Sequence, residues 1–379
     1  MAKPAVSAVV DASGEERASV AQLIERARAA MQQIAAADQV RIDELVTAIA
    51  WSVYKPENAR RLAEQAVADT GIGNADDKVI KNQRKTFGTL RDLMRARTVG
   101  IIEADSGNGM IKYGKPVGVV AAITPSTNPA ATPVNKSMMA LKGANAIVIA
   151  PSPAGWGSTN ATHAQLRAAL AKVGAPEDLV QILPHPVSRN MTRLLMEQAD
   201  LIVATGSQNN VRAAYSSGTP AIGVGAGNVP VIIDSSADLA DAAEKICASK
   251  TFDNSTSCSS ENSLVILDDV YEDALAALET AGGYRCSSDE KSLIADRLWI
   301  DGNLNRDLIA KDADVFAAGV GFDEKAKQAR FFMVEEDFDP NSKFADEKLS
   351  LVLTIYRARD FDHAVKLVTD ILNVQGRGH

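Results

Sequence analysis

Cys258 lies in a segment whose composition suits a reactive thiol better than a packed one. The segment reads KTFDNSTSCSSENSLVI, and Ser257, Ser259 and Ser260 flank the cysteine. A structural cysteine usually lies among aliphatic neighbours and behaves as a small hydrophobe. A thiolate that attacks an electrophile needs a polar, accessible setting. We therefore interpret Cys258 as a candidate nucleophile.

The other two cysteines have ordinary settings. Cys247 falls in the helical pattern AEKICASK, and Cys286 follows GGYR in an expected loop, so we interpret both as structural. An odd count of three cysteines without paired spacing argues against a disulfide framework and indicates a reducing compartment. No C-x-x-C or His/Cys cluster offers the spacing of metal ligands, so we expect no metal site.

Charge and hydropathy narrow the classes of partner. The net charge is -8 and the pI is near 5.2, which argues against nucleic acid or an anionic membrane as the main partner. The N-terminal segment soon turns acidic, so we expect no signal peptide. No apolar run approaches the ~18 residues that span a bilayer. These features predict a cytoplasmic protein, and 379 residues favour two domains.

The order of the expected elements predicts an α/β fold. Apolar residues recur at helical spacing through residues 16–97, and short apolar runs then follow at 117–123, 146–150, 179–183 and 200–205. Helical stretches separate these runs, which is typical of a Rossmann-type, doubly wound parallel sheet. A helix, a strand at 263–267 and a late strand at 351–358 then predict a second α/β domain. We divide the chain into residues 1–240, with N-terminal helices and a dinucleotide-binding domain, and residues 241–379, the catalytic cysteine domain.

Ligands bind such sheets beyond the carboxyl ends of the strands, so we expect ligand-binding residues in the loops there. Asn128 lies in the loop TPSTNP after the first strand. Its amide can cap the next helix, or it can donate a hydrogen bond to a developing oxyanion. Taken alone, the residue favours the cap.

Two further loops are candidates for holding a cofactor. Thr205-Gly206-Ser207 ends a strand and QNNVRAAYSS can open a helix, whose first N–H groups can bind a phosphate. The glycine cluster GVGAGN, residues 223–228, matches only part of a dinucleotide fingerprint, and a tight turn explains it equally well.

These segments together resemble one family. GVVAAITPSTNPAATPVNKSMMALKGANAIVIAPSP, ATGSQNNVRAAYSSGTPAIGVGAGNVPVIID, the cysteine segment and FADEKLSLVLTIYRARDFDHA occur in one order and resemble the CoA-acylating branch of the aldehyde dehydrogenase superfamily over residues 15–379. The resemblance implies an aldehyde dehydrogenase-like fold, with Cys258 as nucleophile and Asn128 as oxyanion donor beside the backbone N–H of Cys258. Glu347 matches the family glutamate that grips the nicotinamide ribose, although an exposed carboxylate at a helix start would look the same. The cofactor-binding residues are then expected to be Thr124, Pro125, Ser126, Thr127, Pro151, Ser152, Pro153, Thr205, Gly206, Ser207, Gly225, Ala226, Gly227 and Glu347.

The acyl acceptor follows from a missing residue. In the hydrolytic branch a glutamate in an E-L-G-G-K type segment activates water, and Val224-Gly225-Ala226-Gly227-Asn228 stands in that place. Water is a poor nucleophile at neutral pH without a positioned base, whereas a thiol is already partly ionised. The sequence therefore favours CoA as the acceptor.

Some positions depart from the family pattern. Val211 replaces the second glycine of the nicotinamide loop, and Ser152 and Pro153 stand where a lysine beside the adenosine ribose is expected. The choice between NAD and NADP therefore stays open. The chain stops at VQGRGH, and His379 matches a histidine after which the family usually continues, so we expect part of the catalytic domain and an oligomerising strand to be missing. The family resemblance implies a homodimer or homotetramer.

The expected reaction is reversible oxidation of an aldehyde with NAD or NADP and CoA, giving an acyl-CoA. The cysteine segment most resembles acylating sulfoacetaldehyde dehydrogenases, and the hydroxyls of Ser255, Thr256 and Ser257 suit a small polar aldehyde. Arg377 is a candidate partner for a sulfonate. The alternatives are acetaldehyde or another short aldehyde, a phosphate-dependent relative such as a semialdehyde dehydrogenase or glutamyl-phosphate reductase, and an inactive nucleotide-binding relative.

Overall fold

The computed structural model describes residues 6–375. Its contacts divide the chain into two compact units. The first contains Met1–Gly71 and Lys78–Gly225, and the second contains Ile72–Asp77 and Ala226–His379. The chain thus changes unit at Gly225–Ala226, whereas the sequence expectation placed the change near residue 240.

Helices dominate the start of the chain, as the spacing of apolar residues predicts. Local signals set their ends: Asp38 caps the second helix by accepting a hydrogen bond from the Arg41 N–H, and the third begins at Pro56 and stops at Gly71 in a left-handed conformation. The four helices are α1 (Val6–Gln33), α2 (Gln39–Tyr54), α3 (Pro56–Thr70) and α4 (Ala75–Leu93).

The first unit is built on a five-stranded, all-parallel sheet in the order β5-β4-β3-β6-β7. The predicted runs form four of these strands, and the fifth, β7, was not predicted. The strands are β3 (Val119–Thr124), β4 (Ala146–Pro151), β5 (Val180–Ile182), β6 (Leu201–Thr205) and β7 (Ala221–Val224). All residues of β3 and β4 are buried, which explains their continuous apolar runs.

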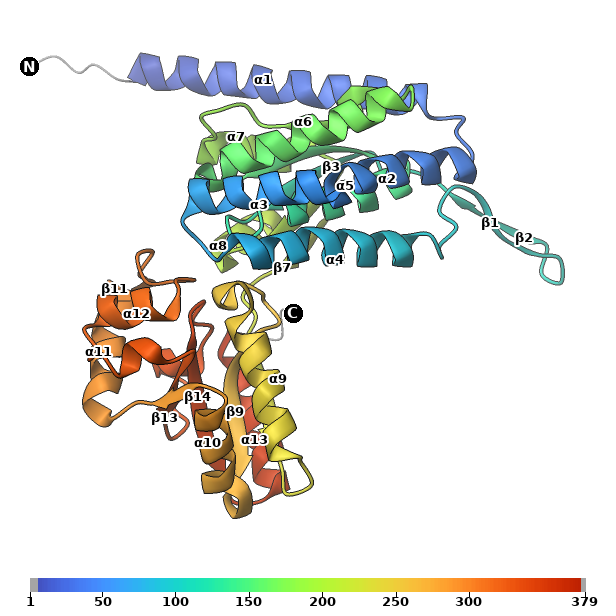
Figure 1. Cartoon of the computed structure of the whole chain (residues 1–379). Helices are drawn as coiled ribbons and strands as arrows, with labels where there is room; N and C mark the ends of the chain where they lie inside the picture. Colours follow the sequence, from blue (N-terminus) through green and yellow to red (C-terminus); the bar gives the residue numbers. More distant parts are fainter. Residues whose placement is uncertain (1–5, 376–379) are drawn as a thin grey trace, which may run out of the picture. The chain divides into compact units, whose positions relative to one another are not determined.

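The helices of this unit make the sheet doubly wound (Figure 1). From β3 the chain winds outward through β4 to β5, and it then returns to β6 on the other side of β3. The switch point of the sheet therefore lies between β3 and β6, where the loops after these strands diverge and ligands bind in such folds. The helices between the strands are α5 (Ala131–Lys142), α6 (Trp156–Lys172), α7 (Arg189–Gln198) and α8 (Gln208–Tyr215).

A two-stranded hairpin precedes the sheet and was not predicted. Its strands are β1 (Gly100–Asp105) and β2 (Met110–Gly114), and they pair antiparallel. Residues on both strands are exposed, so neither strand shows the alternation that marks a half-buried strand. Figure 1 shows the hairpin projecting from the rest of its unit.

The second unit contains another all-parallel sheet, in the order β10-β13-β14-β9-β8. The sequence predicted β9 and β14 but not the other three. The strands are β8 (Val229–Ile233), β9 (Glu261–Leu267), β10 (Gly283–Arg285), β13 (Phe331–Glu335) and β14 (Val352–Ala358). A short antiparallel pair, β11 (Trp299–Ile300) and β12 (Asn303–Leu304), lies apart from the main sheet.

Helices pack on the strands of this sheet. The first follows β8 and leads to the cysteine segment, and the last contacts β8, β9 and β14. They are α9 (Leu239–Thr251), α10 (Tyr271–Thr280), α11 (Ser288–Leu298), α12 (Ala313–Val320) and α13 (Phe361–Gln375). The predicted fold class, a Rossmann-type parallel sheet plus a second α/β domain, is confirmed. Within residues 6–375 the structure contains no helix of the length and apolarity that crossing a membrane requires.

Candidate active site

Three of the predicted site residues meet at one edge of the second sheet. Gly227 lies two residues before β8, Cys258 lies three before β9, and Glu347 lies five before β14. These strands are neighbours in the sheet and run parallel, so the segments before them come together at its amino edge. Strand order thus gathers residues that are more than a hundred positions apart in the sequence.

Cys258 is exposed on a turn between α9 and β9. No described residue accepts a hydrogen bond from its backbone N–H. The other two cysteines differ. Cys247 is buried and Cys286 is half-buried, and burial raises the thiol pKa of both. Cys258 is the exposed thiol of the three, as the polar flanks predicted.

The backbone before Cys258 has an unusual conformation. Asp253, Asn254 and Ser255 have φ angles of 49°, 51° and 63°, three consecutive left-handed residues none of which is glycine. Asp and Asn tolerate this region better than most residues, whereas serine has no such preference. Such a turn persists only when its surroundings hold it.

Residues distant in the sequence anchor the first two of these residues. The Asp253 N–H donates to the Asp77 carboxylate at 2.7 Å, and the Asp253 carboxylate accepts from the Asn74 N–H at 3.0 Å. The amide of Asn254 donates to the Asp312 carboxylate at 2.7 Å. Residues 74 and 77 therefore belong to the second unit by contact although they lie among the N-terminal helices in the sequence.

Gly227 packs directly on the nucleophile. A Cβ added to Gly227 would lie 2.4 Å from the backbone oxygen of Cys258. The Gly227 carbonyl accepts from the amide of Asn262 at 3.0 Å, and Asn262 also accepts from the backbone N–H of Lys348 at 3.1 Å. Asn262 thus ties together the segments before β8 and β14, on both sides of its own strand.

Glu347 is half-buried in a segment outside any helix, so it is not an exposed carboxylate at a helix start. Its carboxylate accepts a hydrogen bond from the Gly227 N–H. Burial raises its pKa to about 7, and this hydrogen bond opposes the rise. The group therefore titrates near neutral pH beside the segment that contacts Cys258.

In the first unit, Asn128 does not cap the helix that follows it. The capping position of α5 is Ala130, and no side chain makes a cap hydrogen bond there. The described contact of the Asn128 amide is a long one, 3.5 Å to the Thr127 hydroxyl. The capping interpretation, which the residue alone favoured, is wrong, and the amide remains available as a donor.

The loops with the other expected cofactor residues lie at the carboxyl edge of the first sheet. The Ser152 N–H donates to the Thr124 carbonyl at 3.1 Å, which joins the loops after β3 and β4. Gly206 has a φ of 140°, and Ser207 caps α8 by accepting from the Asn210 N–H. The structure therefore brings these predicted segments to one edge of the sheet. The residues placed there are Thr124, Pro125, Ser126, Thr127, Pro151, Ser152, Pro153, Thr205, Gly206 and Ser207.

Features of this edge fit a dinucleotide. The Thr124 hydroxyl is buried without a hydrogen-bond partner among the described residues. Such an orphaned group at a ligand-binding edge indicates a missing polar partner. The capped start of α8 also presents backbone N–H groups of the kind that bind phosphate. Gly225 ends this unit against the Gln208 side chain, and Ala226 and Gly227 begin the other.

Sequence reasoning missed the buried lysines next to these segments, among them Lys136 and Lys250. The Lys136 amine donates to the carbonyls of Ile123 and Val203 at 2.6 and 2.8 Å, bridging β3 and β6 at the switch point. Burial lowers its pKa to about 7. The Lys250 amine donates to Ser255 and Glu261, on either side of Cys258 in the turn of residues 253–260, here called the cysteine turn. A lysine at helical spacing gives no sign in the sequence that its amine is buried.

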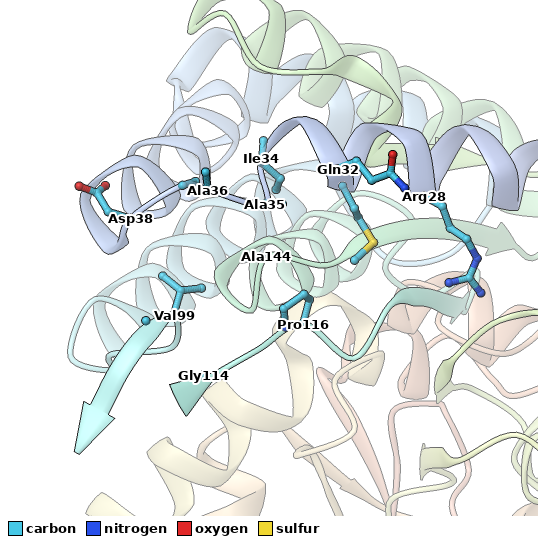
Figure 2. Close-up of a pocket in the computed structure, with 13 residues that line it drawn as sticks. Arg28, Gln32, Ile34, Ala35, Ala36, Asp38, Val99, Gly114, Pro116 and Ala144 are labelled. Carbon is cyan, nitrogen blue, oxygen red and sulfur yellow. The ribbon is translucent and has the colours of Figure 1, made fainter. Parts of the chain in front are cut away.

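The first unit also has a pocket of about 710 Å³ away from these loops. Figure 2 shows it between the end of α1, at Arg28 and Gln32, and residues Val99, Gly114 and Pro116. Pro116 precedes β3, so the pocket lies at the amino edge of the sheet, opposite the cofactor loops. None of its lining residues is a predicted site residue.

No group of three or more His, Cys, Asp or Glu residues within the described chain has metal-binding geometry. His379 and Arg377, which the sequence analysis singled out, lie outside the described residues.

The chain is similar to proteins of known activity over most of its length. Residues 3–283 match the model of the aldehyde dehydrogenase family. An acylating sulfoacetaldehyde dehydrogenase of Cupriavidus necator is 50% identical over 99% of this chain and 77% of that protein. One from Bilophila wadsworthia is 44% identical over 95% of this chain and 79% of that protein.

Solved structures agree with this result. An acetylating aldehyde dehydrogenase from Geobacillus thermoglucosidasius is 35% identical, with a TM-score of 0.91 over 96% of this chain and 80% of that one. A propionaldehyde dehydrogenase of Rhodopseudomonas palustris, solved with bound propionyl-CoA, is 26% identical, with a TM-score of 0.84 over 93% of this chain and 77% of that one. The chain therefore belongs to the aldehyde dehydrogenase family, among its acylating oxidoreductases.

Proposed function

We propose that the chain catalyses the reversible oxidation of sulfoacetaldehyde to sulfoacetyl-CoA with NAD or NADP. The observation that carries the proposal is the exposed Cys258 on an anchored turn, in a chain 50% identical to an acylating sulfoacetaldehyde dehydrogenase. The expected site residues fall in two structural units, which supports different roles for the two units. The first unit provides most of the expected dinucleotide-binding residues, and the second provides the nucleophile together with Ala226, Gly227 and Glu347.

The chemistry begins at the thiol. The Cys258 thiolate adds to the aldehyde carbon and forms a thiohemiacetal, whose oxyanion needs hydrogen-bond donors. We assign this role to the backbone N–H of Cys258 and to the amide of Asn128, both of which lack a strong internal acceptor. A bound nicotinamide dinucleotide supplies the hydride acceptor. Loss of hydride from the thiohemiacetal carbon leaves a thioester on Cys258.

Transfer of the acyl group to CoA completes the cycle. The CoA thiolate attacks the thioester carbon, acyl-CoA forms, and the Cys258 thiolate leaves as the protein is regenerated. The segment Val224–Asn228 contains no carboxylate to activate water. Within it the Asn228 amide is occupied, because it donates to the carbonyls of Ala345 and Ile371 at 2.7 and 3.1 Å. A thiol therefore suits this site better than water as the acyl acceptor.

The structure changes the argument for a polar substrate. Ser255 and Thr256 are buried, and their hydroxyls bond inside the protein: Ser255 with Lys250 and Ser260, and Thr256 with Asp253 at 2.6 Å. The expectation that these two hydroxyls face the aldehyde is therefore wrong. Ser257, the third of these hydroxyls, is half-buried and stays a candidate. The choice of sulfoacetaldehyde now rests mainly on the similarity to the two sulfoacetaldehyde dehydrogenases.

The deciding experiment follows nicotinamide reduction by absorbance with sulfoacetaldehyde or acetaldehyde, each with and without CoA. We expect turnover only with CoA, a higher kcat/KM for sulfoacetaldehyde, and no turnover by Cys258→Ala. Cys286→Ala, which removes a half-buried thiol, is the matched control and should keep its activity. Turnover without CoA would refute the assignment of the acyl acceptor, and a preference for acetaldehyde would refute the substrate.

The same assay distinguishes the alternative functions. A phosphate-dependent dehydrogenase would turn over with inorganic phosphate in place of CoA. An inactive relative would show no turnover, and its Cys258 would react with iodoacetamide no faster than a free thiol. A homodimer or homotetramer and a cytoplasmic location stay predictions.

A further inference from the structure

Lys250 is a wholly buried lysine that forms no salt bridge with any residue from 6 to 375. It lies in the last turn of α9, with none of its surface exposed. Its amine donates to the Ser255 hydroxyl at 3.1 Å and to the Glu261 carbonyl at 2.8 Å. Burying an amine whose hydrogen-bond acceptors are neutral costs stability relative to an apolar side chain of similar size, and the carboxylates of Glu261 and Glu347 are near enough to offset part of that cost. The two hydrogen bonds of this amine are therefore expected to have a role beyond packing.

The two acceptors bracket the nucleophile. Ser255 lies three residues before Cys258, and Glu261 lies three residues after it, at the start of β9. A single amine therefore joins both ends of the cysteine turn. A second bridge reinforces the first, because the Ser255 hydroxyl donates to the Ser260 hydroxyl at 3.0 Å. In Figure 1 the yellow helix α9 leads into this turn.

Ser255 is the member of the left-handed run that depends most on such support. A left-handed conformation is unfavourable for a non-glycine residue, because its Cβ crowds the following carbonyl oxygen. Asp253 and Asn254 tolerate this region and have anchors of their own at Asp77 and Asp312. Ser255, with φ of 63°, has neither advantage, and its side chain is held by Lys250 and Ser260.

We propose that Lys250 is a positioning residue, which holds Ser255 in its left-handed conformation and so fixes the thiol and backbone N–H of Cys258 for attack on the aldehyde. The proposal rests on the proposed function, in which Cys258 is the nucleophile. Lys250 acts through the turn, because its buried amine has no route to the substrate. Displacement of a reacting group by about 1 Å is enough to cost about 100-fold in rate.

The alternative is that Lys250 only stabilises the fold. The two roles differ in what its loss changes. Loss of a purely structural lysine lowers the melting temperature and the fraction of active protein but leaves kcat per active site unchanged. Loss of a positioning lysine lowers kcat per active site, because the thiol and the backbone N–H of Cys258 are displaced.

The experiment is a double-mutant cycle with Lys250→Met and Ser255→Gly. Glycine adopts a φ near 63° without cost, so it removes the need for the hydrogen bond from Lys250. We expect Lys250→Met to lower kcat per titrated active site at least 30-fold in the natural background and less than threefold in the Ser255→Gly background. Equal losses in both backgrounds would overturn the proposal, since independent effects add.

Further variants keep the test decisive if Lys250→Met does not fold, and they control for the effect of removing any buried lysine. If Lys250→Met does not fold, Ser255→Ala and Ser255→Gly are compared, because both remove the hydroxyl but only alanine resists the left-handed conformation. The proposal then requires kcat to be at least tenfold lower for Ser255→Ala, and equal values would overturn it. Lys142→Met removes another buried lysine, which pairs with Asp43 on α2 far from the cysteine turn in the sequence, and should lower stability without changing kcat.

Failure of the proposed function gives a different result. In that case the unmodified protein shows no CoA-dependent turnover at all, and the cycle is measured instead as the rate of Cys258 alkylation by iodoacetamide, with mass spectrometry of its peptide. The same coupling between Lys250 and Ser255 is expected there, and its absence would overturn the positioning role. An active unmodified protein whose Lys250→Met variant keeps its kcat refutes only the role of Lys250.

Discussion

The backbone of Gly227 lies against the carbonyl oxygen of Cys258, so closely that a Cβ on Gly227 would be 2.4 Å from it. No real Cβ tolerates that distance, so Gly227→Ala must shift the cysteine turn or the segment before β8. We expect a fall in kcat of about 10- to 100-fold, because displacement of a nucleophile is costly. The overpacking should also lower the free energy of unfolding by about 1–3 kcal/mol.

Gly88→Ala is the matched control for this variant. Gly88 lies within α4, and nothing lies within 4 Å of an added Cβ. Alanine favours a helix over glycine by about 1 kcal/mol. Steady-state kinetics should show no change, and thermal unfolding should show equal or higher stability. A loss of activity from Gly88→Ala comparable to that from Gly227→Ala would contradict the contact as the cause.

Asn128→Ala tests the amide as an oxyanion donor. Loss of one such donor typically lowers kcat by about 100- to 1,000-fold. Because Asn128 does not cap α5, we expect almost no change in the melting temperature. Kinetics and differential scanning calorimetry on the same preparation separate these effects. An unchanged kcat would remove Asn128 from the catalytic set.

Asn145 is a contrasting amide in the same unit. Its oxygen accepts from the N–H groups of Val117 and Gly118 at 2.7 and 3.1 Å, and its amide donates to the Ala140 carbonyl at 3.1 Å. Asn145→Ala leaves the buried N–H of Gly118 without its acceptor, at about 1–3 kcal/mol. We therefore expect lower stability from Asn145→Ala with an unchanged kcat per active site, the reverse of Asn128→Ala.

Glu347 predicts a defined pH dependence of stability. Burial raises its folded pKa to about 7 from 4.5, so between these values the folded state holds a proton that the unfolded state has lost. The stability from this proton is complete below about pH 4.5 and is lost as the pH rises through about 7. Glu347→Gln has no such proton. Its melting temperature should therefore rise relative to that of the unmodified protein between pH 5 and 8, and parallel curves would contradict this account.

Lys136→Met tests the bridge at the switch point of the first sheet. Lys136 holds the carbonyls of Ile123 and Val203, next to the loops that the proposal assigns to the dinucleotide. We expect the KM for the dinucleotide to rise about tenfold, which corresponds to ~1.4 kcal/mol. Lys142→Met, on the same helix but paired with Asp43, should leave this KM unchanged. Equal KM values for both variants would refute the role of the bridge.

The parts of the fold that the sequence predicted are those whose pattern depends on burial. Strands β3 and β4 are buried throughout, so their apolar runs could be recognised. The hairpin β1–β2 is exposed on both strands, and β7 is only four residues long, so neither has a hydrophobic period to read. Strand β8 was hidden by its proline and by the glycines before it.

The candidate site divides in the same way. Cys258 was predictable because its neighbours are polar, and the loops of the first unit were predictable because they follow recognisable strands. Lys250 was not, since its burial depends on a turn whose anchors lie at residues 74, 77 and 312. Ser255 and Thr256 were misread for the same reason: a hydroxyl in the sequence does not reveal whether it bonds inward or faces a substrate.

The anchors of the cysteine turn limit how enzymes of this family can be recombined. The segment around Cys258 is short and contiguous, so it can be exchanged between related enzymes as one cassette in order to change the substrate. Its conformation, however, is shared with Asn74, Asp77 and Asp312, none of which lies inside the cassette. A chimera that moves the cysteine segment alone would carry the nucleophile without the residues that shape its backbone, so a transferable unit has to include all of them.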